Sequence, residues 1–289
     1  MESLFLKGTA IGFSCESWKN DPNLLASWLI SYLETWQLAH FDESGRFRTE
    51  LAPEVRKRYG EVKAAIQAIQ NDIHNLAIAY HQMNYVLNDE KIGNGLKMLY
   101  LGNLTEYYII NIRTIYDFMA VFARLAADRG QIGQGHVSTD SLTRLLKGIK
   151  DNWERSNRLF SEPVVSVYTA MDDSLCTIRL IRDAIVHDGK DSIVTIKNAK
   201  PYFRVPKTIN TPYETLLPDI LDLKQNDYPL FPYLQKISND LFMHMHNLGV
   251  VLSNDAYTKN NTYKAELPAL IGICIPTFVS FLEEDFSLS

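Results

Sequence analysis

The residues best suited to do chemistry lie together in the stretch Ile181–Lys190, at the end of an apolar segment. They are an arginine, a carboxylate and an imidazole: Arg182, Asp183 and His187. A guanidinium stabilises the charge that develops on a phosphate during displacement, and an imidazole exchanges a proton near neutral pH. Together these groups are the minimum equipment of a site that cleaves RNA without a metal ion.

The spacing of these residues limits how they can meet. Asp183 and His187 are four positions apart and share a helix face, so the carboxylate can hold the imidazole in one tautomer. Arg182 and His187 are five positions apart, which separates them by about 140° around a helix and roughly 7.5 Å along it. We expect His187 to lie in a fraying last turn before Gly189, or a second copy of the helix to pack across a two-fold axis, and we favour the second arrangement.

One helix is predicted to position all three residues. Ser161-Glu162-Pro163 is typical of a cap and first turn, and the helix is predicted to run through to His187. The helix has an apolar stripe, and Arg182 falls at the next position of that stripe. Burying a guanidinium there lowers stability unless a carboxylate, a partner chain or a phosphate accepts its hydrogen bonds. The stripe consists of Val164, Tyr168, Met171, Leu175 and Ile178.

A second interpretation of the same stretch needs no chemistry. Arg179, Arg182, Asp183 and His187 can form a ladder of ion pairs along one helix, with His187 favoured because cations suit helix C-termini. Gly189 would then end the helix as a C-cap. The residues alone leave both interpretations open.

The rest of the chain is predicted to be mainly helical. Apolar residues recur at spacings of three and four from Tyr59 to Leu87, and a second long helix is expected from about Leu96 to Ala127, so the two form an antiparallel hairpin. Ser192–Ile196 and Tyr202–Val205 are predicted to pair as a β-hairpin. Further expected elements are a helix over Asp21–Trp36, a shorter one over Ser138–Lys150, a proline-rich extended segment over residues 206–230, a helix around Leu234–Val251 and a proline-broken helix after Leu267.

The run Arg182-Asp183-Ala184-Ile185-Val186-His187 resembles the R-x4-H signature of the HEPN superfamily (higher eukaryotes and prokaryotes nucleotide-binding). The polar residue straight after the arginine and the His-x-Gly ending are part of the resemblance. Two long antiparallel helices followed by a capped fourth helix are also similar to the HEPN four-helix bundle. Gly189 stands where some toxin members carry a tyrosine.

The resemblance implies a mainly α fold: an up-down HEPN-like four-helix bundle with a small β-hairpin and additional C-terminal helices. We expect residues 1–54 to form an N-terminal helical extension and residues 55–190 the bundle. Residues 191–289 would add the hairpin and a C-terminal helical extension packed on the bundle. The resemblance further implies a homodimer whose two motifs face one cleft.

Many HEPN relatives are metal-independent endoribonucleases of toxin–antitoxin and phage-defence systems, and others only bind nucleotides or proteins. The resemblance implies that His187 takes the 2′-hydroxyl proton, Arg182 holds the scissile phosphate and Asp183 orients the pair. RNA and an antitoxin-like protein are the implied partners. The alternative functions are a non-catalytic helical module that binds a nucleotide or protein, and a structural interaction protein.

The composition of the chain bears on which of these functions it can have and where in the cell it acts. The formal net charge of −5 argues against a protein that coats nucleic acid, so any RNA contact is expected to be a local basic patch. Three widely spaced cysteines favour a reducing compartment without a disulfide framework. Glu2 stands where a signal peptide is basic, and the longest apolar run, Leu267–Leu282, is too short to span a bilayer. We therefore expect a cytoplasmic protein without membrane contact.

We expect neither a cofactor nor a metal. The glycine-rich motifs of nucleotide-binding loops and the G-x-S-x-G motif are missing from the sequence. His74 and His81 are seven apart without a third ligand one helical turn away, so we expect both on a polar helix face. His244 falls on the apolar stripe of its helix and is predicted to be a hydrogen-bonded core histidine.

Overall fold

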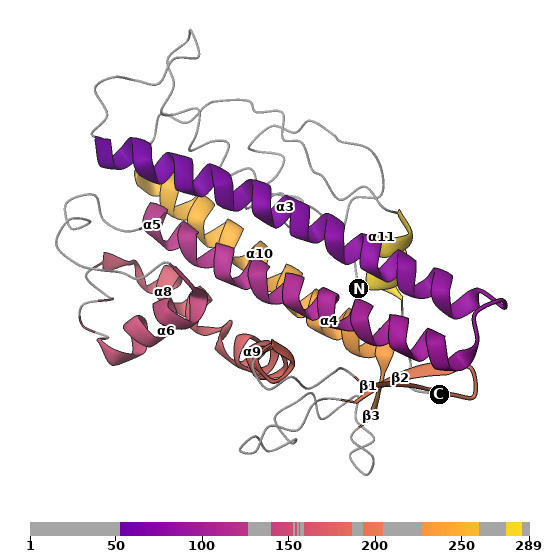
Figure 1. The fold of residues 1–289 in the computed structure, drawn as a ribbon. Helices are drawn as coiled ribbons and strands as arrows, with labels where there is room; N and C mark the ends of the chain where they lie inside the picture. Colours follow the sequence, from indigo (N-terminus) through magenta and orange to yellow (C-terminus); the bar gives the residue numbers. More distant parts are fainter. Residues whose placement is uncertain are drawn as a thin grey trace, which may run out of the picture. The chain divides into compact units, whose positions relative to one another are not determined.

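The computed structural model describes residues 53–126, 140–186 except 153, 155, 157 and 158, 193–204, 227–259 and 276–284. This part of the chain is mainly helical and contains a small antiparallel sheet (Figure 1). The helix expected over Asp21–Trp36 lies outside the described residues. The helices are α3 (Pro53–Asn88), α4 (Asn94–Met119), the 3₁₀-helix η1 (Ala120–Phe122), α5 (Ala123–Ala126), α6 (Leu142–Asp151), α8 (Glu162–Thr169), α9 (Asp172–Val186), α10 (Leu230–Lys259) and α11 (Pro276–Glu283).

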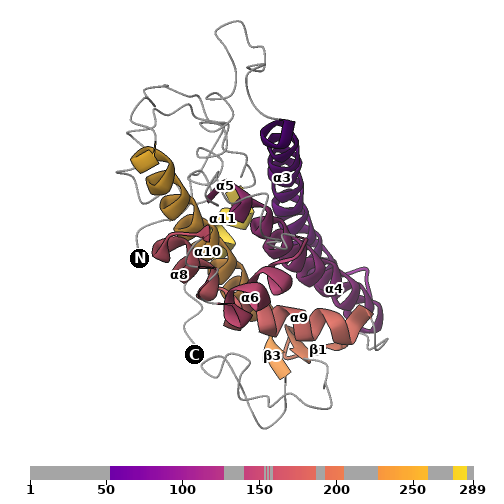
Figure 2. The same cartoon turned by 90° about the vertical axis from the view of Figure 1, so that its left-hand side faces the viewer.

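The predicted hairpin of long helices is confirmed: α3 and α4 lie side by side in both views (Figures 1 and 2). The buried Lys97 at the start of α4 donates from Nζ to the carbonyl oxygen of Leu87 at 2.7 Å, which satisfies an acceptor that the end of α3 leaves without a helical partner. The second helix was expected to continue to Ala127. Instead α4 tightens into η1 at Ala120, and α5 follows.

The expected single helix from Ser161 to His187 is wrong, because the structure divides it into α8 and α9. Near the break, Thr169 turns its hydroxyl back to the carbonyl oxygen of Val165 at 2.8 Å, and the Met171 amide bonds to Tyr168 at 3.1 Å. Thr105 makes the same kind of bond to Leu101 inside the unbroken helix α4, so this bond alone does not end α8. The predicted stripe stays buried on both sides of the break, with at most 2% exposure for Val164, Tyr168, Met171, Leu175 and Ile178.

The predicted β-hairpin is confirmed as β1 (Ile193–Lys197) and β2 (Lys200–Arg204), joined by Asn198 and Ala199 with φ values of 50° and 60°. Two successive positive φ values are the signature of a tight hairpin turn. The sheet gains a third strand, β3 (Asp227–Pro229), from the segment expected to be merely extended. Its proline is tolerated because β3 is an edge strand.

The chain forms two compact units, which share the long helices. In its described part, the first contains α3 up to Asn71, the end of α4 from Ile115, η1, α5, α6, α8 and α10 from Phe242. The second contains the remainder of α3, α4 and α10, together with α9, the sheet and α11. The expected division of the chain at residues 54 and 190 stays a prediction.

The first unit is held by polar bonds between helices, which are buried or partly buried. Tyr116 of α4 bonds through its hydroxyl to His244 Nδ1 at 2.9 Å, so His244 is hydrogen-bonded as predicted, but it is only half-buried and not a core residue. The Tyr168 hydroxyl donates to the carbonyl oxygen of Met119 at 3.0 Å, which ties α8 to the end of α4. Asp117 accepts the backbone amide of Leu142 at 3.0 Å and so positions the start of α6.

The second unit combines aromatic packing with a buried hydroxyl chain. Tyr80 of α3 stacks on Phe281 of α11 with ring centroids 4.1 Å apart. The fully buried Tyr108 hydroxyl lies 2.6 Å from Ser238 Oγ, and Ser238 donates its single proton to the carbonyl oxygen of Leu234 at 2.7 Å. Tyr108 must therefore be the donor to Ser238.

We expect Ser238→Ala to lower the free energy of unfolding by more than Tyr108→Phe does. Ser238→Ala leaves the Tyr108 hydroxyl buried without its acceptor and should lower the free energy of unfolding by about 1–3 kcal/mol. Tyr108→Phe leaves Ser238 bonded to Leu234 and should cost roughly 0.5–1.5 kcal/mol. Urea denaturation measures both. The exposed Ser166→Ala should be nearly neutral, and an equal loss in both serine variants would contradict the assignment.

Burial also perturbs an acid on α3. Desolvation raises the pKa of the Asp72 carboxyl above its ordinary value of 3.8, although a hydrogen bond from Asn75 opposes the shift. The buried Oδ2 atom of Asp72 has no hydrogen-bond partner among the described residues. The folded chain thus holds this proton to higher pH than the unfolded chain, so ionisation of Asp72 lowers stability as the pH rises above 3.8.

Asp72→Asn should therefore stabilise the protein at pH 7, because the amide carries no charge to desolvate. The difference from the parent chain should shrink as the pH falls towards 3.8, because the folded carboxyl, with its raised pKa, regains its proton before the unfolded one does. Thermal unfolding between these pH values measures the difference. Glu90→Gln, at an exposed turn position, controls for the loss of one negative charge. A gain that is constant with pH would rule out this explanation.

Candidate functional site

Arg182 and Asp183 lie near the C-terminal end of α9, which ends at Val186. The buried face of α9 is formed by Leu175, Ile178 and Ile181, which are at most 2% exposed. Ile181 thus takes the seam position that the stripe predicted for Arg182. The Arg182 side chain lies at the border of that face with 35% of its surface exposed, so solvent and solutes reach it.

The structure brings two of the three predicted site residues together. Arg182 Nη1 donates to Asp183 Oδ1 at 2.9 Å, and the Asp183 side chain is 43% exposed. His187 lies outside the described residues, so its predicted contacts with Arg182 and Asp183 stay predictions. The Arg182–Asp183 ion pair is one of the contacts that the ion-pair interpretation predicts. It also leaves the Arg182 guanidinium partly exposed near the end of α9, as a phosphate-binding site requires.

The Arg182–Asp183 pair has a clear electrostatic consequence. A half-exposed ion pair is screened by water and contributes at most about 1 kcal/mol to stability. A guanidinium presents its donors in a planar fork that matches two phosphate oxygens, whereas a carboxylate beside it lowers the local positive potential. A phosphate that binds Arg182 must therefore compete with Asp183, and such binding should weaken with salt.

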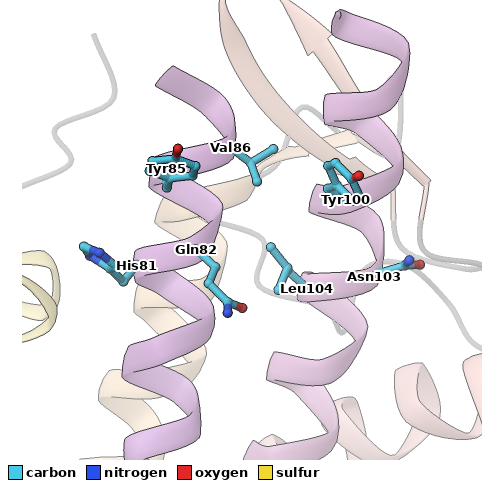
Figure 3. A pocket seen from close by; sticks show the side chains of 7 residues that line it. All are labelled: His81, Gln82, Tyr85, Val86, Tyr100, Asn103 and Leu104. Atoms are coloured by element: carbon cyan, nitrogen blue, oxygen red, sulfur yellow. The ribbon is translucent and has the colours of Figure 1, made fainter. Parts of the chain in front are cut away.

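The structure has a second surface feature that the sequence did not predict, a pocket of about 420 Å³ between α3 and α4 (Figure 3). Gln82, Val86 and Leu104 lie in the space between the two helices, whereas His81 and Asn103 point outwards on opposite sides. The lining contains no aspartate, glutamate, lysine or arginine side chain. It consists of His81, Gln82, Tyr85 and Val86 of α3 and Tyr100, Asn103 and Leu104 of α4. The signal that could have revealed it is the apolar character of α4 on nearly all sides.

The described residues contain neither a candidate metal site nor a candidate membrane span. Within the described ranges, no group of three or more histidine, cysteine, aspartate or glutamate side chains is placed to hold a metal ion. In the same residues, no helix combines the length and hydrophobicity needed to cross a bilayer.

No family model matches the chain, no curated protein matches its sequence, and no solved structure matches it.

Because their ion pair is half-exposed, Arg182→Ala and Asp183→Ala should each change the free energy of unfolding by less than about 1 kcal/mol. Ile181→Ala, one residue away and 1% exposed, should cost about 2–5 kcal/mol through a core cavity. Urea denaturation of the three variants separates the two kinds of position. A large loss at Arg182 would assign it a structural role instead.

Proposed function

We propose that the chain is a HEPN-like, metal-independent endoribonuclease that cleaves single-stranded RNA as a homodimer. The observation that carries the proposal is the R-x4-H spacing from Arg182 to His187, with its arginine exposed near the end of a helix that follows a long antiparallel hairpin. Arg182 is 35% exposed and not enclosed in the core, which meets the first requirement for a phosphate contact.

The proposed reaction is an internal displacement at phosphorus. His187 accepts the 2′-hydroxyl proton, the 2′-oxygen attacks the adjacent phosphorus, and the bond to the 5′-oxygen breaks as that oxygen takes up a proton from water. Arg182 neutralises the charge on the non-bridging phosphate oxygens. Asp183 keeps the guanidinium and imidazole oriented. The products are a 2′,3′-cyclic phosphate and a 5′-hydroxyl end.

The cellular setting is part of the proposal. Three widely spaced cysteines fit a reducing compartment such as the cytoplasm. An enzyme that cuts RNA without a cofactor must be restrained, so a toxin–antitoxin or phage-defence system with an antitoxin-like protein partner is a fitting context. The net charge of −5 favours the other candidate, a non-catalytic module that binds a nucleotide or protein at the same residues.

Incubation of the full chain with an unstructured, 5′-labelled RNA in EDTA should produce fragments that end in a 2′,3′-cyclic phosphate. His187→Ala and Arg182→Ala should each lower the cleavage rate by at least about 100-fold, because they remove the proton acceptor and the charge stabilisation. Arg144→Ala is the control, since Arg144 is also an arginine paired with a carboxylate on the surface, Asp140 at 3.2 Å, but lies outside the motif.

Cleavage that survives in either site variant would overturn the mechanism. RNA binding by the parent chain without cleavage, lost in Arg182→Ala, would favour the binding module. Parent and variants that neither bind nor cleave RNA would leave the ion-pair ladder as the better account of this stretch.

A further inference from the structure

Arg179 lies on the same flank of α9 as Arg182 but has no carboxylate partner. The two arginines are three positions apart, which separates them by about 60° around the helix and about 4.5 Å along it. Asp183 follows Arg179 by four positions, a spacing at which helical ion pairs form. Its Oδ1 atom instead accepts from Arg182 at 2.9 Å. Among the described residues, none forms a hydrogen bond or ion pair with Arg179.

The usual structural roles of a helical arginine do not account for Arg179. The helix dipole stabilises a cation near the C-terminal end, but this effect fades within the last turn, and Arg179 lies almost two turns before Val186. The residue is only partly exposed, so its guanidinium loses part of its hydration without gaining a partner among the described side chains. An anionic ligand would accept the hydrogen bonds that the guanidinium gives up.

The two arginines also make the C-terminal half of α9 locally positive. Arg179 and Arg182 are balanced there by one carboxylate, Asp183, which leaves one positive charge over. The other acidic residues of α9, Asp172 and Asp173, belong to its first turn, roughly 9 Å or more from Arg179 along the helix axis. In a chain with a net charge of −5, an RNA contact requires such a local basic patch.

We propose that Arg179 binds the phosphate next to the scissile one, so that the RNA strand runs along this flank of α9. The inference rests on the proposed function, because it takes Arg182 as the residue that holds the scissile phosphate. Side chains three positions apart on a helix are neighbours, so two guanidinium groups at this spacing reach adjacent phosphates of one strand. A guanidinium grips phosphate through two parallel hydrogen bonds and reads no base. The preferred substrate is therefore a strand with at least two consecutive phosphates, whatever its sequence at these positions.

Binding of a fluorescent 2′-O-methyl RNA tests the phosphate contact without cleavage, because this strand lacks the attacking hydroxyl. Arg179→Ala should raise the dissociation constant about 10-fold through the loss of charged hydrogen bonds. Between about 50 and 200 mM salt, it should also flatten the dependence of log affinity on log salt by about 0.7, the value for one contact to a single strand. Arg179→Lys should restore this slope because it keeps the charge. Arg144→Ala, outside the patch, should change neither quantity, and fluorescence anisotropy measures both.

The length of a cleavable RNA separates the roles of the two arginines. With a longer strand, Arg179→Ala should raise KM about 10-fold and change kcat less than about 2-fold, because it removes binding that the ground state and the transition state share. With a dinucleoside monophosphate, which carries only the scissile phosphate, Arg179→Ala should change neither constant. Arg182→Ala should lower kcat with both substrates.

The possible results separate this inference from the proposed nuclease. An Arg179→Ala variant with the affinity, salt slope and KM of the parent chain would overturn the inference and leave the nuclease standing on Arg182 and His187. An equal loss with the long strand and the dinucleoside monophosphate would overturn it too, since Arg179 would then act through the structure. Binding that Arg179→Ala weakens, without any cleavage by the parent chain, would support the phosphate contact and favour the binding module. A parent chain that neither binds the 2′-O-methyl strand nor cleaves RNA would overturn both proposals.

Discussion

Buried tyrosine hydroxyls on α4 are the constraint on which the helical packing depends. A phenol brings a large apolar ring into the core, but its hydroxyl must find a partner there. In the second unit Tyr108 bonds to Ser238, and in the first unit Tyr116 bonds to His244, so α10 supplies the partner in both units. These bonds fix which residues of α10 lie against α4, a specificity that apolar contacts alone do not provide.

Helix α4 is apolar on two sides, and this constraint concerns only the inner one. Its inner face, with Tyr108, Ile112 and Tyr116, is fully buried, whereas the outer face is exposed and just as apolar. Core packing accounts for the apolar residues of the first face. Exposed apolar patches are typical of interaction surfaces, and the second face has this character.

The sequence predicted the elements that rest on local pattern. The α3–α4 hairpin, the β1–β2 hairpin and the hydrogen-bonded His244 follow from apolar spacing and turn residues. The break between α8 and α9 could not be predicted, because Thr169 and the residues after it are compatible with continued helix and only tertiary packing decides. Strand β3 was missed for a related reason: it is three residues long and exists through its pairing with β2.

The sequence pattern also failed to predict which residue near the end of α9 is buried. The pattern placed Arg182 in a buried seam because it took the step after Ile178 as four residues. In the structure that step is three residues, so Ile181 faces the core and Arg182 lies at its border, paired with Asp183. Arg182 therefore needs no phosphate or partner chain to offset a burial penalty. Its partial exposure leaves the guanidinium accessible, and a guanidinium must be accessible to bind a phosphate. Helix α9 ends at Val186 and His187 lies outside the described residues, so the convergence of Arg182 with His187 across two copies of the chain stays a prediction from their five-residue spacing.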